Sequence, residues 1–413
     1  MLDTSFSPWP AFTEEEADAV RAVILSGRVN YWTGKECRLF ENEFAQSVAC
    51  SHGVAMANGT LALEIAMRAL DIGPGDEVIV TPRSFIASVS CVVAVGATPV
   101  FADIDPESQN ITAETIAAVL TPRTRAIICV HLAGWPCDMD PIMALAEEHA
   151  IDVVEDCAQA HGAVYKGRPV GSLGHIAAWS FCQDKIMTTG GEGGMVTTND
   201  PILAARTWSY KDHGKSRDTA ARPGHSGSAF RWLHDRFGTN ARMLEVQAVI
   251  GRIQLQRLPQ WSEQRRRNAE RIWATATRLP GLRAGTIPED IVHAAYKCYV
   301  FVDLDRLQPD WNRDRILASI QVLGVPCYAG SCPEIYRENA FDGTGLRPAG
   351  RLPVAEALGR SALMFLVHPT LQEHEIERSC EVLREVMQEA ALPSPIPRRT
   401  EVAAAQAAVF QAL

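Results

Sequence analysis

The sequence lacks long apolar runs and a targeting segment. It contains no apolar stretch of the roughly 18 residues that a membrane-spanning helix needs, and its most apolar windows, such as residues 89–95, are far shorter. Residues 1–10 show no basic start followed by an apolar core of the kind that directs secretion. These absences predict a cytoplasmic protein that does not associate with membranes.

Paired cysteines, excess basic charge and internal repeats are also missing. The 11 cysteines are scattered and never spaced as C-x-x-C, which favours packed, reduced thiols over disulfides or a structural metal site. Lys and Arg number 39 against 49 Asp and Glu, a net charge of −10. This balance excludes a broad nucleic-acid-binding face, while a local anion pocket stays open.

What the chain does have is the composition of a folded protein, with 47% hydrophobic and 21% charged residues. A capping box from Thr13 to Glu16 predicts a helix that ends near Gly27, and an amphipathic segment predicts a second helix over 36–48. Short apolar strands then alternate with helices. The predicted strands are residues 53–57, 77–81, 98–102, 126–130 and 151–155, and the helices between them are 60–70, 84–95, 112–120 and 139–149. This alternation predicts an α/β fold with a mostly parallel sheet covered by helices.

The pattern changes after residue 171. Strands are expected at 176–181 and 194–198, followed by a long loop over 214–240. The later expected elements are helices at 243–258, 261–279, 313–323 and 373–389 and a strand at 298–304. We therefore expect a large domain over residues 1–255, a smaller C-terminal α/β domain over 256–392, and a loosely attached tail over 393–413.

Two turns that follow predicted strands have the composition of a ligand site. In Asn58-Gly59-Thr60, the free amides of a helix start and a hydroxyl would suit a phosphate, although an ordinary capped turn has the same sequence. Asp156 and Gln159 follow the strand at 151–155, and ligands of open α/β sheets bind at such strand ends. Alternatively, Asp156 caps the next helix.

Two later segments have the same character. Lys185 follows an apolar strand and precedes the glycine-rich residues 190–194. It is either a solvated surface charge or a partly desolvated amine that can form a Schiff base. The segment 238–245, which contains Asn240, leads into a helix and is either a ligand loop or another loop-to-helix junction.

Together these four segments, in this order, resemble the DegT/DnrJ/EryC1/StrS family of sugar aminotransferases, which are fold-type-I pyridoxal-phosphate enzymes. The resemblance extends from the region of Gly27 to about residue 390. It implies the fold-type-I architecture, with a large domain that binds the cofactor. It also implies pyridoxal 5′-phosphate as that cofactor and a homodimer with shared active sites.

The resemblance further implies roles for individual residues. Lys185 would be the catalytic lysine that binds the cofactor covalently, and Asp156 would pair with the ring nitrogen, which keeps the ring able to accept electrons. The other implied cofactor contacts are Gly59, Thr60 and Ser180 at the phosphate, Phe85 against the ring, Gln159 at the ring hydroxyl, and Asn240 from the neighbouring subunit. Phe85 is alternatively a core residue. Segments that approach the substrate in the family contain Tyr31, Trp32, His213 and Tyr328, each of which is equally explained as a surface or packing residue.

The chain departs from the family pattern at two places. It has Cys182-Gln183-Asp184 before the lysine, where the family often has His, Gly, Asn or Ser, and Ala241 where the family's loop commonly has an aromatic residue. Neither change removes an implied cofactor contact. Both lie where substrate selection could be altered.

The implied activity is transfer of an amino group from L-glutamate or L-glutamine to a keto sugar in amino-sugar or polysaccharide biosynthesis. The expected acceptor is a nucleotide-linked 3-keto or 4-keto deoxysugar, and the alternative is a free keto sugar or an inosose. A pyridoxal-phosphate-dependent sugar dehydratase would carry His in place of Lys185. A non-catalytic relative would lack Asp156, Gln159 or Lys185. Neither a metal nor a nucleic-acid partner is expected.

Overall fold

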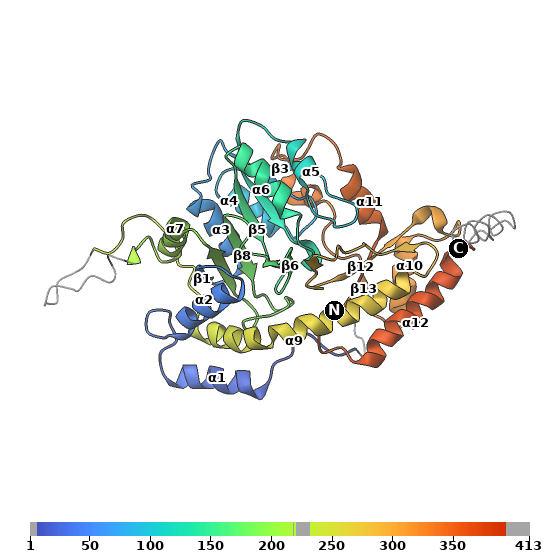
Figure 1. The fold of residues 1–413 in the computed structure, drawn as a ribbon, viewed down its shortest axis with the longest axis horizontal. Helices are drawn as coiled ribbons and strands as arrows, with labels where there is room; N and C mark the ends of the chain where they lie inside the picture. The colour runs from blue at the N-terminus through green and yellow to red at the C-terminus, as the bar shows by residue number, and fades with distance from the viewer. Residues whose placement is uncertain (1–5, 218, 220–231, 394–413) are drawn as a thin grey trace, which may run out of the picture.

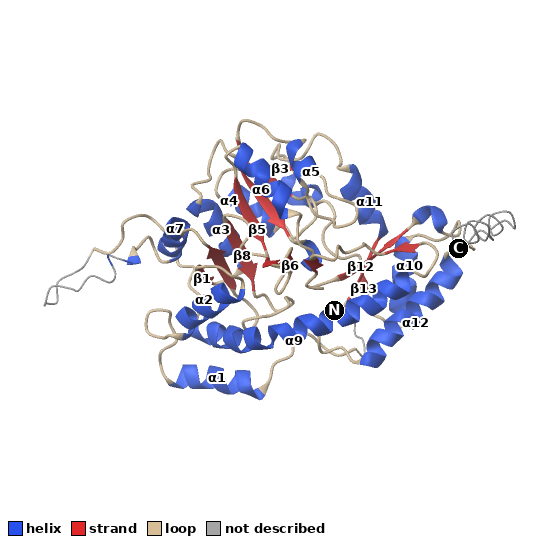
Figure 2. Cartoon of the chain, in the orientation of Figure 1, coloured by secondary structure: helices blue, strands red, loops and turns tan. Residues whose placement is uncertain are grey.

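The computed structural model describes residues 6–217, 219 and 232–393, and its largest element is a seven-stranded sheet (Figures 1 and 2). The strand order is β1-β9-β8-β5-β4-β2-β3. The strands are β1 His52–Met56, β2 Glu77–Val80, β3 Thr98–Phe101, β4 Thr124–Val130, β5 Asp152–Asp156, β8 Ile176–Ser180 and β9 Gly194–Thr198. Only β9 among these runs antiparallel to its neighbours, which confirms the predicted α/β fold with a mostly parallel sheet. The predicted tail lies, apart from residue 393, outside the described residues.

Seven α-helices of the described residues precede, separate and directly follow these strands in the chain, and the first of them, α1, packs on the later helix α9 (Glu245–Ala276) and not on the sheet. They are α1 Glu14–Leu25, α2 Glu36–Ser47, α3 Gly59–Ala69, α4 Ala87–Ala94, α5 Ala113–Ala117, α6 Met139–Glu148 and α7 Pro201–Lys211, with a 3-10 turn over Leu132–Gly134. α3 lies against β8 and β9, α4 against β2 and β3, and α6 against β5. The sequence pattern did not predict α7, although its start is well marked. The Asp200 side chain caps its first amides and Pro201 occupies its first turn.

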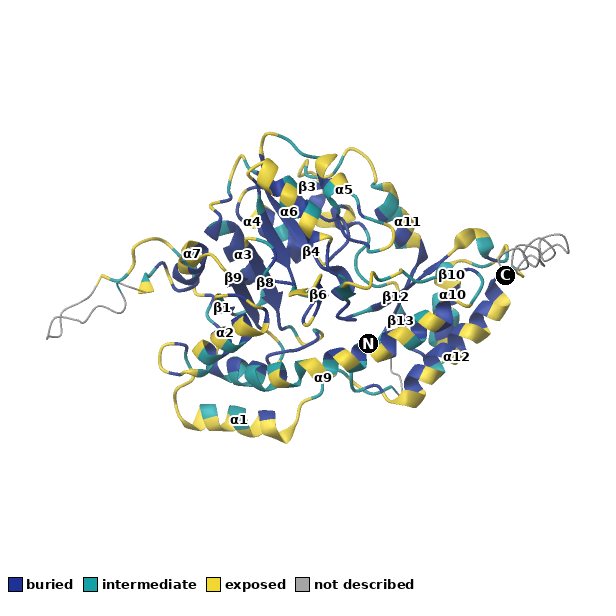
Figure 3. Ribbon diagram, viewed as in Figure 1, coloured by how far each residue is buried: buried dark blue, intermediate teal, exposed yellow. Residues whose placement is uncertain are grey.

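The strands are buried on both faces, which explains their sequence. Every residue of β2 and of β8 is buried, and the centre of the sheet is dark blue in Figure 3. A strand covered on both sides needs apolar residues at successive positions and shows no alternation. The continuous Val and Ile runs therefore located these strands to within about two residues of their observed ends.

A second, antiparallel sheet and a second hydrophobic core follow in the C-terminal part. The sheet has the order β10-β12-β14-β13. Its elements are β10 Leu282–Arg283, β12 Cys298–Val302, β13 Cys327–Tyr328 and β14 Ala362–Phe365, with α10 Arg313–Val322, α11 Pro353–Ser361 and α12 Glu373–Ala390. Short 3-10 helices span Leu304–Arg306, Ile335–Arg337 and Asn339–Phe341. A small third sheet joins β11 Ile291–Val292 to β6 Val164–Tyr165 and β7 Arg168–Pro169. These short strands escaped the sequence pattern because two residues show no periodicity.

One long helix, α9 Glu245–Ala276, connects the two cores. It contacts α1 and α2 in the first part and β12 and α12 in the second, and it runs along the lower side of Figure 1. The helical pattern expected over 243–258 and 261–279 is one continuous helix, with Pro259 inside it. A proline in that position removes one backbone hydrogen bond, and packing on both cores compensates for the loss. The expected boundary after residue 255 falls inside α9, and the division into two domains stays a prediction.

The described residues include no helix with the length and apolar character that crossing a bilayer requires. All 11 cysteines are free thiols, of which nine are buried and two, Cys182 and Cys332, are partly exposed.

A close backbone contact between β9 and the start of α3 gives a test of this fold. A Cβ atom at Gly194 would lie 2.4 Å from the carbonyl oxygen of Asn58 and 2.9 Å from the amide nitrogen of Gly59. Because these are backbone atoms, Gly194→Ala is expected to lower the free energy of unfolding by about 1–3 kcal/mol, measured by urea denaturation. Gly350→Ala, where the added Cβ has no atom within 4 Å, is the control. Equal stability of the two variants would contradict this contact.

Candidate active site

A cavity of about 700 Å³ lies where the carboxyl ends of the parallel strands meet the C-terminal part of the chain. Its walls come from the start of α3, the segment before α4, the ends of β5 and β8, and the residues around 296 and 331. The cavity brings together most of the residues that the sequence analysis selected. These are Gly59, Thr60, Phe85, Asp156, Gln159, Ser180 and Lys185.

The start of α3 forms one wall. The Asn58 side chain caps the helix by accepting the Leu61 amide hydrogen at 2.9 Å, so the amides of Gly59 and Thr60 stand at the helix start beside the cavity. A Cβ at Gly59 would lie 2.6 Å from the Cβ of Ser180. Only glycine therefore lets α3 come this close to the end of β8.

Phe85 forms a second wall, just before α4. Its side chain is 66% exposed and lines the cavity, so the alternative that it is a core residue does not hold. An aromatic ring left open beside a cavity is available for stacking on a flat ligand.

Asp156 is the last residue of β5, and Gln159 follows three residues later. Asp156 accepts hydrogen bonds from the Ser88 hydroxyl at 2.7 Å and the Ala158 amide at 3.1 Å. Burial raises the pKa of this carboxyl, while the bonds from Ser88 and Ala158 and the charge of Lys185 oppose the rise. No helix follows Asp156 directly, so its predicted alternative as a helix cap is not realised. The side-chain oxygen of Gln159, Oε1, accepts the Ala133 amide hydrogen at 2.9 Å.

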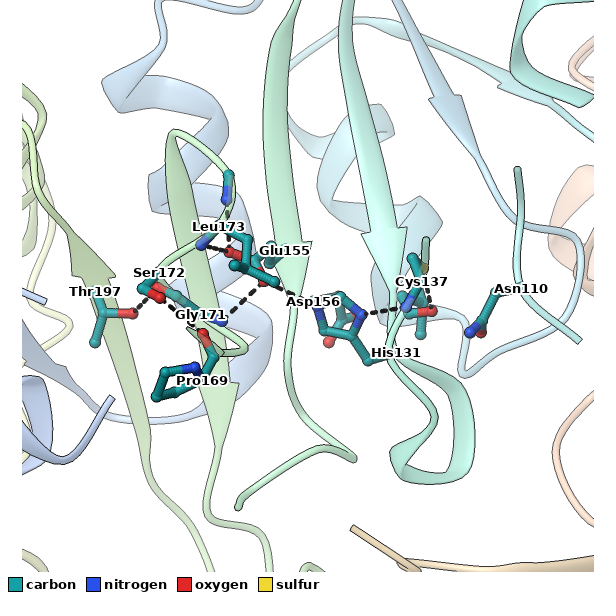
Figure 4. A network of polar contacts seen from close by, with 12 residues as sticks. Asn110, His131, Cys137, Glu155, Asp156, Pro169, Gly171, Ser172, Leu173 and Thr197 are labelled. Atoms are coloured by element: carbon teal, nitrogen blue, oxygen red, sulfur yellow. Dashed lines mark hydrogen bonds and ion pairs between the residues drawn. The ribbon is translucent and has the colours of Figure 1, made fainter. Parts of the chain in front are cut away.

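The neighbouring Glu155 fixes this end of the sheet from the opposite face of β5 (Figure 4). Its carboxylate accepts the amides of Gly171 at 2.8 Å, Leu173 at 2.8 Å and Gly174 at 2.7 Å, and it contacts the His131 ring at 2.9 Å. Burial alone would raise the pKa of Glu155, but the bond to His131 and the amide bonds outweigh it and lower the pKa.

His131, Glu155 and Cys157 also form a grouping whose ligand atoms lie within 4.8 Å of one another. Each carboxylate oxygen of Glu155 already accepts two bonds, and His131 Nδ1 accepts the Cys137 amide hydrogen at 3.0 Å. We therefore assign this grouping a structural role.

Lys185 lies on the loop that follows β8, with 15% of its side chain exposed. Its Nζ donates to the Tyr296 hydroxyl at 3.3 Å and lies 3.5 Å from an oxygen of Asp184. Trp9 holds the loop from outside by donating its indole N–H to the Lys185 carbonyl at 2.8 Å. The alternative that Lys185 is a solvated surface charge is therefore excluded.

Two groups of cavity residues were missed by sequence reasoning. Tyr296 and Lys297 precede β12, and Gly330, Ser331 and Cys332 follow β13, so all of them come from the C-terminal part. Both partly exposed cysteines, Cys182 and Cys332, line the cavity. Burial is the main cause that raises the pKa of both thiols. None of these residues stands in a motif, and only Cys182 is close to one in sequence.

The expected substrate residues lie elsewhere. Tyr31 is buried, donating its hydroxyl to Glu41 at 3.1 Å and accepting from Trp208 at 3.0 Å. Trp32 and His213 line a second cavity of about 790 Å³, and Tyr328 is half-buried against the first core. Asn240 is exposed. None of these five lines the cavity around Lys185, and their proposed roles stay predictions.

Comparison with known proteins identifies close relatives. A family model described as the DegT/DnrJ/EryC1/StrS aminotransferase family matches residues 10–384. The dTDP-3-amino-3,4,6-trideoxy-alpha-D-glucose transaminase of Streptomyces venezuelae is 35% identical over 90% of this chain and 92% of its own length. The GDP-perosamine synthase of Caulobacter vibrioides is 36% identical over 84% of this chain and 89% of its own length. The X-ray structure of an aminotransferase from Psychrobacter cryohalolentis superposes with a TM-score of 0.91 at 59% identity, over 93% of this chain and 99% of that one.

The hydrogen bonds of Glu155 predict that the free energy of unfolding falls as the pH becomes acidic. Because the pKa of Glu155 is lowered, its carboxylate stabilises the fold at neutral pH, and this contribution is lost as the pH falls through the lowered pKa. Glu155→Gln turns one accepting oxygen into an NH₂ group that faces donors. We expect it to cost about 2–4 kcal/mol at neutral pH and to weaken the acid dependence, measured by urea denaturation across the acidic range.

The control is Glu289→Gln, which changes an exposed loop residue and should alter neither quantity. An acid dependence in Glu155→Gln as steep as in the wild type would show that the network does not carry it.

Proposed function

The chain belongs to the DegT/DnrJ/EryC1/StrS aminotransferase family and is therefore a sugar aminotransferase. We propose the substrates between which it transfers the amino group. The amino donor is L-glutamate or L-glutamine, and the acceptor is a nucleotide-linked 3-keto or 4-keto deoxysugar. The names of two relatives support this acceptor class, since one names a dTDP-linked amino sugar and the other GDP-perosamine. The nucleotide differs between them, so the nucleotide stays open for this chain.

The observation that carries this proposal is the convergence of Lys185, Asp156 and the start of α3 on one cavity. The family implies a dependence on pyridoxal phosphate, and the cavity fits that group. Gly59 leaves helix amides beside the cavity, Phe85 presents an open ring, and Asp156 provides a buried carboxyl. When bound, the cofactor supplies an aldehyde that reacts with amines and a ring that accepts electrons.

We assign the cofactor contacts as follows. Gly59, Thr60 and Ser180 would bind the phosphate, because helix-start amides and hydroxyls are donors that suit an anion. Phe85 would lie against the ring, and Gln159 would bind the ring hydroxyl.

Two side chains would handle protons. Asp156 would hold a proton on the ring nitrogen by supplying a charge of opposite sign. Lys185 would hold the aldehyde and, once its amine is free, would take the proton from Cα of the amino donor as a general base.

We also propose a homodimer in which Asn240 binds the phosphate in the neighbouring subunit. Asn240 is exposed and does not line the Lys185 cavity of its own chain, which supports a role in trans. Trp32 and His213 would meet the acceptor through the second cavity. That cavity also carries Lys215, Arg236 and Arg242, whose charges suit a diphosphate. Tyr31, which packs against Trp32, would support that wall, and Tyr328 would support the acceptor site from β13.

Lys185→Ala tests the assignment of the catalytic lysine. The variant should fold normally, lose the visible absorbance of covalently bound cofactor, and lose turnover by at least about 100-fold, the lower end of what a proton-transfer group contributes. Absorbance spectra and the rate of 2-oxoglutarate formation measure these effects. Lys35→Ala, which changes an exposed lysine at the start of α2, is the control. An active Lys185→Ala enzyme would remove the basis of the proposal.

A panel of keto sugars tests the acceptor class. dTDP-, UDP- and GDP-linked 3-keto and 4-keto deoxysugars and a free inosose would each be offered with L-glutamate or L-glutamine. We expect an amino-sugar product, identified by mass, and 2-oxo acid from a nucleotide-linked sugar only. Amination of the free inosose with no reaction of any nucleotide-linked sugar would favour the alternative acceptor.

A further inference from the structure

Asp184 and Tyr296 form a closed set of contacts with Lys185. The Tyr296 hydroxyl donates to Asp184 Oδ2 at 2.5 Å and accepts from Lys185 Nζ at 3.3 Å. Asp184 Oδ1 lies 3.5 Å from the same Nζ. Each of the three side chains therefore contacts the other two, and Asp184 and Lys185 are 112 and 111 residues away from Tyr296 in the sequence.

The charges around these groups fix the direction of the hydrogen bonds. Burial, followed by the charge of Asp184, raises the pKa of Tyr296 well above its usual value, so the hydroxyl keeps its proton. Burial would raise the pKa of Asp184, but the charge of Lys185 and the bond from Tyr296 outweigh it, so this group is a carboxylate. The Tyr296 hydroxyl has one proton and donates it to Asp184. The hydroxyl oxygen of Tyr296 can therefore only accept from the N–H of Lys185.

Other charged or titratable groups face Lys185, Asp184 or Tyr296 without sharing these contacts. They are Asp156, His161, Cys182, Arg265 and Lys297. Burial, followed by the charges of Lys185 and Arg265, lowers the pKa of His161 to about 3, so that ring is neutral. Asp156 accepts from Ser88 and Ala158 instead of from the lysine.

The backbone holds Tyr296 rigidly. Its amide donates to the Ala133 carbonyl at 2.9 Å, and the Ala133 amide in turn donates to Gln159. The tyrosine is 7% exposed. The hydroxyl is therefore a fixed point tied to the floor of the cavity, whereas a free lysine side chain has several rotatable bonds.

We propose that Tyr296, oriented by Asp184, is a positioning residue that holds the amine of Lys185 at the cavity wall. This inference rests on the proposed role of Lys185 as the reacting amine. Asp184 belongs to the segment by which the chain departs from the family pattern, and the sequence interpretation placed that segment near substrate selection. Its contacts are with Lys185 and Tyr296, so the departure acts on the amine. Fixing an amine in one orientation raises the rate of reactions at its nitrogen.

Tyr296→Phe is the direct test, because it removes the hydroxyl and keeps the ring, whose centre lies 5.1 Å from Nζ. We expect full cofactor occupancy, an unchanged KM for both substrates, and a kcat about 10- to 100-fold lower. We also expect the apoprotein to take up added pyridoxal phosphate more slowly, followed by absorbance. Tyr336→Phe is the matched control, since it removes another tyrosine hydroxyl that donates to a carboxylate, in a part of the chain away from Lys185.

Asp184→Asn separates charge from hydrogen bonding, because the amide still offers an accepting oxygen. We expect a smaller loss of kcat and a shift to lower pH of the midpoint at which the visible absorbance of the bound cofactor changes. The reason is that positive charge on the cofactor-bound nitrogen loses its carboxylate partner. The double variant should lose less kcat than the two single losses combined, since the two side chains contact each other and the same amine.

The outcomes distinguish the two proposals. Wild-type kcat in Tyr296→Phe, together with an inactive Lys185→Ala, would overturn this inference and leave the proposed function standing. An active Lys185→Ala would overturn both. If Tyr296→Phe fails to fold, Asp184→Asn decides, because its side chain is 57% exposed and tolerates the change. An unmoved absorbance midpoint in that variant would overturn the inference.

Discussion

The buried carboxylate of Glu155 is the interaction on which the geometry of the site depends. It accepts the amide hydrogens of Gly171, Leu173 and Gly174 from the turn at residues 171–174, and this turn leads directly into β8. Glu155 thereby sets the position of β8 relative to β5. Asp156 extends from one strand and Ser180 and Lys185 follow the other, so one side chain determines the spacing between the acid and the amine. Its bond to His131 keeps it charged where burial would otherwise favour the neutral form.

The sheet and the motif residues were accessible from the sequence for one physical reason. Parallel strands covered on both sides must be apolar throughout, and a ligand site at their carboxyl ends places polar residues directly after such runs. Asp156 and Lys185 both stand in that position. The sequence also indicated that Gly59 belongs to a turn. It did not indicate why a glycine is needed there, which is the close contact with Ser180.

The parts that escaped prediction depend on contacts between distant segments. Tyr296 meets Lys185 only because the second core places the start of β12 beside the loop after β8, and no local pattern encodes that distance. Pro259 lies inside α9, where local propensity favours a break, and packing on two cores keeps the helix continuous. Tyr31 was selected because its segment approaches the substrate in the family, and its buried hydroxyl contacts Glu41, a partner that no local pattern indicates. In each case tertiary packing decides what the local sequence leaves open.

The distribution of thiols has a consequence for covalent ligands. Nine of the 11 cysteines are buried, and the two that remain within reach of solvent both face the cavity. An electrophilic group carried by a sugar-like ligand would thus meet Cys182 from the loop after β8 and Cys332 from the segment after β13, with the other thiols shielded. Because burial keeps both groups protonated, a reagent that needs a thiolate would label them slowly at neutral pH, and the ligand's residence time would govern selectivity.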